Sequence, residues 1–317
     1  MMPMRERALI ERIRKRARRA PSSLLARGIG DDCAVLKPPR GYELLVTTDF
    51  CLENIHFRRE WQPARAVGHR CLVRGLSDIA AMGGEPLAAF LSLALPSDIS
   101  QRWVDGFFDG LFALADRWHV PLAGGDVAQS PQGVMADIQV LGSVPRGRAI
   151  LRSTARPGDL IYVSGELGLS VAAFNQFRAG KKPTARSAPR YFFPEPRIDL
   201  GLYLRQQKLA TAMIDLSDGL STDLSHICEE SRVGAVLYAD SIPHPENGLE
   251  MALNGGEDYE LLFTAAPKAR IPHEIGGLAI TPIGEIVSRR GMWLSDQEGK
   301  RRTLKPRGWE HFRERAK

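Results

Sequence analysis

The segment SVPRGRAILRSTARPGD, residues 143–159, lies near the middle of the chain and shows neither helical nor strand periodicity. Its glycine, proline and charged residues are typical of a surface connection rather than of a packed core. On both sides of it, short apolar runs alternate with longer stretches of helical spacing. The pattern predicts a two-domain α/β (α+β) protein of 317 residues, with domains at 1–148 and 149–317.

Short apolar runs bounded by turn residues predict strands, and apolar residues that recur every three or four positions predict helices. Strands are predicted at 44–49, 86–95, 134–144, 160–165 and, from the run GEDYELLFTA, 256–265. Helices are predicted at 64–82, 100–118, 198–210 and 220–232. The run VPLAGGD, 120–126, predicts a short strand that enters a glycine-rich turn, and the four prolines of 178–197 predict a loop.

Basic residues outnumber acidic ones by 43 to 37, and the net charge of +6 favours an anionic partner such as a nucleotide, a phosphorylated metabolite or nucleic acid. Much of the excess lies in residues 1–19, where a solvated helix face explains the basic run better than a nucleic-acid-binding arm. No apolar run of about 18 residues is present, so no membrane span is predicted. The four cysteines form no CxxC pair, which favours a reducing cytoplasm.

Six aspartates end apolar elements or lie inside them: Asp32, Asp49, Asp78, Asp126, Asp215 and Asp218. Aspartate is common in turns and helix caps, so one such position alone would carry little weight. A carboxylate among buried residues is costly unless it is paired or binds a metal ion, and several such sites together favour metal binding. Carboxylates accompanied by hydroxyl groups, as at Thr47 and Thr48, suit Mg²⁺ rather than zinc.

Glycines accompany several of these acids, at Gly124, Gly125 and Gly219. A glycine lets backbone N–H groups approach phosphate oxygens, and a helix that starts after Gly219 would add a favourable dipole. Because Mg²⁺ held by carboxylates commonly bridges to substrate phosphates, these parts predict phosphoryl transfer. The sequence contains no GxxxxGK(S/T), HRD or DFG motif, so neither a P-loop enzyme nor a protein kinase is indicated.

Several of these stretches resemble the thiamine-monophosphate kinase family, which belongs to the superfamily of aminoimidazole ribonucleotide synthetases. The matching stretches lie in order between residues 28 and 264: GIGDDCAVL, VTTDF, GLSDIAAMGGEP, LAGGD, RPGDLIYVSGELGLS, IDLSDGLSTDLSHI and GGEDYELLFT. The combination of IDLSDGL with GGEDYELLFT distinguishes this family from its superfamily relatives. Val127 and Gly75 depart from the pattern, since the family usually has Thr and Asn at these positions.

The resemblance implies an N-terminal mixed sheet with helices that pairs with a second subunit in a homodimer, and a C-terminal α/β domain that completes the nucleotide and substrate site. It implies that ATP and several Mg²⁺ ions bind between the domains. The implied reaction is direct in-line transfer of the ATP γ-phosphoryl group to thiamine monophosphate. No phosphoenzyme is expected, because no His or Cys lies in a nucleophile context and a phosphate acceptor is already ionised.

The resemblance also implies roles for individual residues. The magnesium ligands fall on Asp32, Thr47, Thr48, Asp49, Asp78, Asp126, Asp215 and Asp218. The implied catalytic residues are Asp78, Asp126 and Asp218. The nucleotide contacts fall on Gly125, Asp126, Arg152 and Ser217, with Phe108 beside the base, and the contacts to thiamine monophosphate fall on His56, Glu257 and Trp309.

Other interpretations stay open. His56 is also compatible with a structural histidine, Glu257 with a strand cap and Trp309 with a cover over an apolar edge. The alternative activity is that of another superfamily enzyme, which activates an amide or selenide through ATP. Such enzymes generally need further N-terminal catalytic residues, and the stretch before Gly28 offers none. A nucleic-acid-binding protein without enzymatic activity would bind in a salt-dependent manner, but no helix-turn-helix or aromatic-basic pattern supports it.

Overall fold

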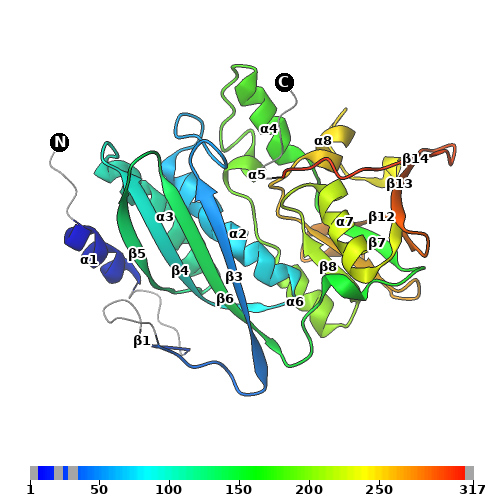
Figure 1. Cartoon of the computed structure of the whole chain (residues 1–317), viewed down its shortest axis with the longest axis horizontal. Coiled ribbons are helices and arrows are strands. Elements are labelled where there is room, and N and C mark those ends of the chain that lie inside the picture. The colour runs from blue at the N-terminus through cyan, green and yellow to red at the C-terminus, as the bar shows by residue number, and fades with distance from the viewer. Residues whose placement is uncertain (1–5, 18–23, 28–34, 311–317) are drawn as a thin grey trace. The chain divides into compact units, whose positions relative to one another are not determined.

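The computed structural model describes residues 6–17, 24–27 and 35–310, which form two compact units (Figure 1). The first unit comprises Met1–Ile79 and Gly84–Arg148, and the second comprises Ala80–Gly83 and Ala149–Lys317. Each contains its own sheet and helices, so the predicted α/β (α+β) fold class is confirmed. None of the helices within the described ranges combines the length and the apolar character that a membrane span requires.

The first unit is built on a four-stranded mixed sheet in the order β3-β6-β4-β5. Its strands are β3 (Tyr42–Leu52), β6 (Met135–Pro145), β4 (Glu85–Pro96) and β5 (Leu122–Ser130). The β3/β6 and β6/β4 pairs are antiparallel, whereas β4 and β5 are parallel and are joined through helix α3 (Gln101–Arg117). A separate small sheet pairs β1 (Leu25–Arg27) with β2 (Val35–Leu36), and helix α1 (Glu6–Ala17) contacts β5.

Helices α2 (Ala64–Ala81) and α3 lie on one face of this sheet (Figure 1). They approach each other closely because glycine stands at their contact. A Cβ atom at Gly68 would lie 1.8 Å from the Phe107 carbonyl oxygen, and one at Gly110 would lie 1.8 Å from the Arg65 carbonyl oxygen. Gly75 similarly faces Val140 of the sheet, since a Cβ atom there would lie 2.5 Å from the Val140 Cγ2 atom. These contacts hold α2, with its acid Asp78, against β3 and β6.

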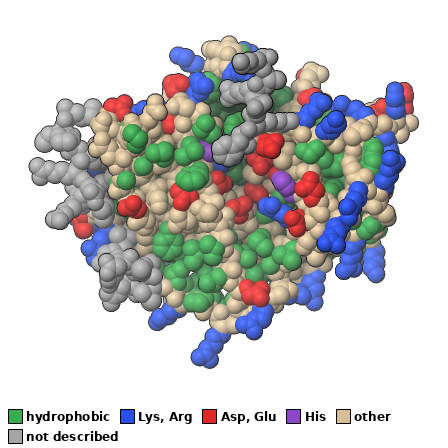
Figure 2. Space-filling view, viewed as in Figure 1, with side chains coloured by type: hydrophobic (Ala, Val, Ile, Leu, Met, Phe, Trp, Pro, Cys, Tyr) green, Lys and Arg blue, Asp and Glu red, His purple; other side chains and the backbone are tan. Residues whose placement is uncertain are grey.

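The other face of the same sheet carries exposed hydrophobic side chains. Leu44, Val46 and Phe50 alternate along β3 and are 48%, 70% and 59% exposed, respectively. Figure 2 shows hydrophobic side chains gathered over this sheet on the face that α2 and α3 leave open. An apolar sheet face of this kind is typical of a surface that another protein covers.

The second unit is built on an eight-stranded sheet, in which only the β9/β13 pair is parallel. Its order is β14 (Arg301–Thr303), β13 (Gly291–Ser295), β9 (Gly234–Tyr238), β12 (Leu278–Val287), β7 (Leu160–Ser164), β10 (Leu261–Ala265) and β8 (Ala210–Asp215), with β11 (Glu274–Ile275) beside β12. The helices are η1 (Arg152–Thr154), α4 (Leu169–Arg178), α5 (Pro189–Phe192), α6 (Ile198–Gln206), α7 (Leu220–Ser231), η2 (Ala239–Ser241) and α8 (Leu249–Asn254). Helix α7 buries Leu220, Leu224 and Ile227 in the core of this unit.

Three predicted elements are wrong in detail. The segment 178–197 is not only a loop, because it contains α5, whose Tyr191 and Phe192 are buried. The strand predicted at 256–265 begins only at Leu261, because Glu257 and Tyr259 have φ angles of 65° and 53° that interrupt an extended backbone. Strand β5 does not end at its glycines but continues to Ser130.

Candidate functional site

In the first unit, β3 places two of the predicted magnesium ligands against α2. The Thr47 hydroxyl donates a hydrogen bond to the Asp78 carboxylate, and Asp49 Oδ1 lies 3.7 Å from Arg74 Nη1. Thr47 and Asp49 share a face because successive strand residues point to opposite sides. The structure therefore brings Thr47, Asp49 and Asp78 to one region, together with the buried cation of Arg74, which the sequence did not suggest.

Thr48 points to the opposite face of the sheet. Its hydroxyl donates to Asp137 Oδ1 at 2.6 Å, and Gln139 Nε2 donates to Asp137 Oδ2 at 2.6 Å. Ser92 of β4 pairs with Asp137 of β6 on one side and with Asp126 of β5 on the other. Asp137 and Asp126 therefore lie on the same face of the sheet, the one that α2 and α3 leave open. Asp137 is a polar candidate that the sequence analysis missed, although an acid inside the apolar run VMADIQVLGSV could have indicated it.

A cavity of about 90 Å³ lies beside this part of β5. Three residues of the predicted nucleotide-binding set line it, namely Phe108, Gly125 and Asp126, together with apolar side chains from α1, β4 and β5. Gly125 has φ +147°, and a Cβ atom there would lie 1.9 Å from the Leu91 carbonyl oxygen, so only glycine fits. The cavity is smaller than a typical small-molecule pocket, and within this unit it can hold only part of a nucleotide.

His56 already has a structural partner. Its Nδ1 atom accepts a hydrogen bond from the Leu52 backbone N–H at 3.0 Å, inside the turn that follows β3. The ring is half-buried. The structural role considered for this histidine is therefore present, and the contact to the acceptor stays a prediction. Asp32, by contrast, lies outside the described residues.

In the second unit, β8 ends at the buried Asp215 and leads through a short turn into α7. In this turn Asp223 Oδ2 accepts hydrogen bonds from the backbone N–H groups of Asp218, at 3.2 Å, and Gly219, at 3.0 Å. Burial, and then the negative charges of Asp215 and Asp218, raise the pKa of Asp223 well above its usual value. Three carboxyl groups therefore crowd at the start of α7, and a cation there would relieve their repulsion.

The turn after Asp215 is joined to the segment that carries Glu257. Backbone hydrogen bonds run from Leu216 N to Glu260 O at 2.8 Å, from Tyr259 N to Leu216 O at 2.9 Å and from Glu257 N to Ser217 O at 2.8 Å. These bonds bring Ser217 and Asp218 next to Glu257. We call residues 215–218 and 257–260, joined in this way, the paired turns.

The C-terminal segment adds the last predicted residue of this unit. Trp309 N donates to Asp218 O at 2.9 Å, which places the backbone of this residue beside the paired turns, and Trp309 is 44% exposed. A Cβ atom at Gly308 would lie 2.1 Å from Asp218 O, so the close approach requires glycine. Arg152 lies elsewhere, because its carbonyl accepts from Ser231 Oγ at the other end of α7. The structure thus groups Asp215, Ser217, Asp218, Glu257 and Trp309, but not Arg152.

The donors in both units are oxygen atoms of carboxylates and hydroxyls, and this chemistry fits Mg²⁺. Among the described residues, no three carboxyl, thiol or imidazole side chains are arranged to hold a metal ion by themselves. Mg²⁺ usually takes only one or two protein carboxylates and completes its ligands with water and substrate phosphates. A pair of acids such as Asp215 and Asp218 is therefore compatible with a Mg²⁺ ion whose other ligands are water and phosphate oxygens.

Comparisons with known proteins identify the family of this chain. The model for the N-terminal domain of AIR synthase related proteins matches residues 30–144, and the model for the C-terminal domain matches residues 156–295. Thiamine-monophosphate kinase of Escherichia coli strain K12 is 38% identical over 303 residues, which cover 90% of this chain and 91% of that protein.

Solved structures extend the likeness to three dimensions. The crystal structure of thiamine-monophosphate kinase from Stenotrophomonas maltophilia K279a matches with a TM-score of 0.83 and 37% identity, over 94% of this chain and 98% of that one. AaThiL complexed with AMPPCP and TMP matches with a TM-score of 0.77 and 31% identity, over 98% of this chain and 100% of that one. The chain therefore belongs to the thiamine-monophosphate kinase family and is a phosphotransferase.

Proposed function

We propose that this protein transfers the γ-phosphoryl group of ATP to thiamine monophosphate, which yields thiamine diphosphate and ADP. The observation that carries the proposal is the cluster of Asp215, Asp218, Glu257 and Trp309 at the paired turns. It unites acids suited to Mg²⁺ with an exposed aromatic side chain that can pack on a flat ring. Support also comes from the relatives named as thiamine-monophosphate kinases and from AaThiL, which was solved with AMPPCP, an ATP analogue, and TMP.

The proposed chemistry is a direct in-line displacement. The acceptor phosphate is ionised at neutral pH, so its oxygen can attack the γ-phosphorus without a strong base. Cys51, Cys71 and Cys228 are buried. A hydrogen bond with Cys51, and then burial, raise the pKa of Cys71, and burial raises the pKa of Cys228, so these two thiols are poor nucleophiles. Bound Mg²⁺ would neutralise phosphate charge. Asp49 with Asp78, Asp126 on the opposite face of the sheet, and Asp215 with Asp218 would hold separate Mg²⁺ ions. Gly125 and Ser217 would contact the nucleotide, and Arg152, at the other end of α7, stays a predicted contact.

The acceptor is tested by measuring ADP release with thiamine monophosphate, free thiamine and unrelated phosphomonoesters. We expect Mg²⁺-dependent release with thiamine monophosphate, because the proposed contacts at Glu257 and Trp309 suit an acceptor that carries both a phosphate and a ring. Removal of Mg²⁺ with an excess of chelator is expected to stop the reaction. Release with free thiamine but not with its monophosphate would refute the proposed acceptor.

We further propose that the open sheet face of the first unit, marked by Leu44, Val46 and Phe50, forms a homodimer interface. Val46→Glu would place a charge in the centre of this apolar face and is expected to raise the dimer dissociation constant at least about tenfold. Light scattering coupled to gel filtration measures this change. The matched control is Phe174→Glu on α4, a residue of similar type that is also exposed. A wild-type protein that is monomeric at micromolar concentration would contradict the proposal.

Location in the cytoplasm, without nucleic-acid or membrane partners, is also proposed. It is supported by the cysteines of the described ranges, since Cys51, Cys71 and Cys228 are buried and form no disulfide, as expected of small core residues in a reducing compartment. The basic residues at the start of the chain fit a solvated helix, because Arg12 and Arg16 of α1 pair with Asp105 and Asp116 of α3. Binding of DNA or RNA that weakens steeply with salt would contradict this proposal.

A further inference from the structure

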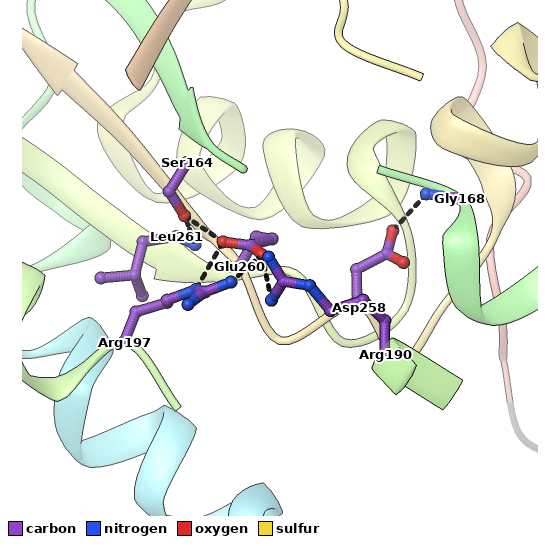
Figure 3. A network of polar contacts seen from close by, with 7 residues as sticks. All are labelled: Ser164, Gly168, Arg190, Arg197, Asp258, Glu260 and Leu261. Carbon is purple, nitrogen blue, oxygen red and sulfur yellow. Dashed lines mark hydrogen bonds and ion pairs between the residues drawn. The ribbon is translucent and has the colours of Figure 1, made fainter. Parts of the chain in front are cut away.

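Glu260 is the last residue of the paired turns, directly before β10, and its carboxylate is almost completely buried, with 1% of the residue exposed (Figure 3). Arg197 binds both of its oxygens, with Nε 2.7 Å from Oε2 and Nη2 at Oε1. Arg190 Nη1 lies 2.9 Å from Oε1, and the Ser164 hydroxyl donates to Oε2. We call Glu260, Arg190, Arg197 and Ser164 the Glu260 clamp.

An ionised carboxylate can accept about four hydrogen bonds, so the four contacts to Glu260 use its full accepting capacity. A two-point arginine pair fixes the orientation of a carboxylate as well as its position. The Ser164 hydroxyl also accepts from Leu261 N at 2.9 Å, so it connects the side chain of Glu260 to the next backbone amide. The clamp therefore holds Glu260 through its side chain and Leu261 through its backbone N–H.

Glycine makes room for the clamp. Gly165 has φ +60°, and a Cβ atom there would lie 2.5 Å from Glu260 Oε1. Any side chain at 165 would strike the carboxylate. The position directly after β7 therefore requires glycine, because the Glu260 carboxylate occupies the space that a side chain would need.

The main chain of Glu260 belongs to the paired turns. Its carbonyl accepts from Leu216 N at 2.8 Å, one residue after Asp215. On the other side of Glu260, Tyr259 and Glu257 have positive φ angles, 53° and 65°, which non-glycine residues adopt only when their surroundings hold them. The clamp supplies a fixed point immediately beside these two residues.

We propose that Arg197 and Arg190 are positioning residues, which act through Glu260 to hold Glu257 and the Asp215–Asp218 turn in the arrangement that binds the acceptor. The proposal rests on the proposed function for its kinetic consequence, although its structural consequence does not need an acceptor. The two arginines come from α5 and from the residue before α6, so a segment predicted as a loop would set the geometry of the acceptor site.

The kinetic test compares Arg197→Gln, Arg197→Lys and Glu260→Gln with a control, Arg302→Gln. Arg302 pairs with Glu250 at 3.2 Å, but the two side chains are 63% and 67% exposed, so this pair belongs to the surface. Loss of the Arg197 clamp is expected to raise the KM for thiamine monophosphate about tenfold to 100-fold, since small displacements of positioning groups have effects of this size. The KM for ATP is expected to rise less, because only Ser217 of the proposed nucleotide contacts lies in the paired turns. Lys at 197 should recover only part of the loss, because an ammonium group cannot bind both oxygens in a plane.

The structural test measures hydrogen exchange of the Leu216, Glu257 and Tyr259 amides, which bridge the paired turns. We expect exchange at least about tenfold faster in Arg197→Gln and Glu260→Gln, with no change in Arg302→Gln. Equal exchange in all variants would overturn the proposal, and so would faster exchange spread evenly over the whole second unit. If the wild-type protein does not phosphorylate thiamine monophosphate, the proposed function fails while the exchange result still decides the role of the clamp.

A pair of glycine variants keeps the test valid if Arg197→Gln does not fold. Gly165→Ala and Gly276→Ala introduce the same side chain at the same φ of +60°, but Gly276 has no neighbouring atom within 4 Å. We expect faster exchange of the bridging amides in Gly165→Ala alone. Equal exchange in the two variants would overturn the proposal, because the difference between them is the contact with Glu260.

Discussion

Replacing Asp78 by Asn is expected to lower kcat by at least about 100-fold, the cost of removing one group that stabilises charge in a transition state. Asn keeps an oxygen that can accept the hydrogen bond of Thr47, so the contact between α2 and β3 is preserved while the charge that would hold Mg²⁺ is lost. The measurement is ADP release at saturating ATP and thiamine monophosphate over a range of Mg²⁺ concentrations. The folded state is checked by thermal unfolding.

The control for this variant is Asp116→Asn on α3. Asp116 pairs with Arg16 at 3.1 Å on the surface of the same unit, and its loss is expected to leave kcat within about twofold. Near-normal turnover of Asp78→Asn would remove Asp78 from the magnesium ligands. A large loss in both variants would show that the effect comes from the stability of the first unit rather than from the site.

Asp258 is expected to make the second unit less stable as the pH rises. Its side chain is buried and accepts from Gly168 N at 2.7 Å, just before α4. Burial is the main cause that raises the pKa of Asp258 from 3.8 to about 7. Because the folded-state pKa is higher than the unfolded one, the folded protein holds an extra proton, and the associated stability is fully present below about pH 4 and lost by about pH 7.

This difference in pKa corresponds to a loss of roughly 4 kcal/mol in the free energy of unfolding, of which roughly 3 kcal/mol falls between pH 5 and pH 8. Asp258→Asn keeps an oxygen for the Gly168 N–H and is expected to lose this pH dependence. Urea unfolding of both proteins at pH 5 and pH 8 measures it, and Asp240→Asn, on the surface, serves as the control. A wild-type protein whose stability rises from pH 5 to pH 8 relative to Asp258→Asn would refute the expectation.

Strongly periodic elements could be predicted from the sequence. Helices α2, α3 and α7 begin and end within a few residues of the expected positions, because their apolar residues repeat with helical spacing and face a core. Strands β3, β4 and β6 could also be predicted from the sequence. The start of β10 was not, because the run GEDYELLFTA hides two non-glycine residues with positive φ angles, which only the surrounding structure can impose.

The site could be predicted only in part. The resemblance indicated the acids, and the structure groups those of the second unit with Glu257 and Trp309. It separates Thr48 from Thr47 and Asp49, although the period of two along a strand could have indicated this. The Glu260 clamp had no local signal, since Arg197 and Glu260 lie 63 positions apart and the arginine stands in a segment expected to be a loop.

The attachment of Gly308 and Trp309 to Asp218 has a consequence for biosynthesis. A chain still emerging from the ribosome can form β8, α7 and the Glu257 turn before residue 309 has been made. During that interval the acids of the turn are in place but the aromatic side chain beside them is missing. Under the proposed function, a nascent protein without this tryptophan would lack one proposed contact to the acceptor, and ribosome-bound intermediates that stop before it are expected to be inactive while largely folded.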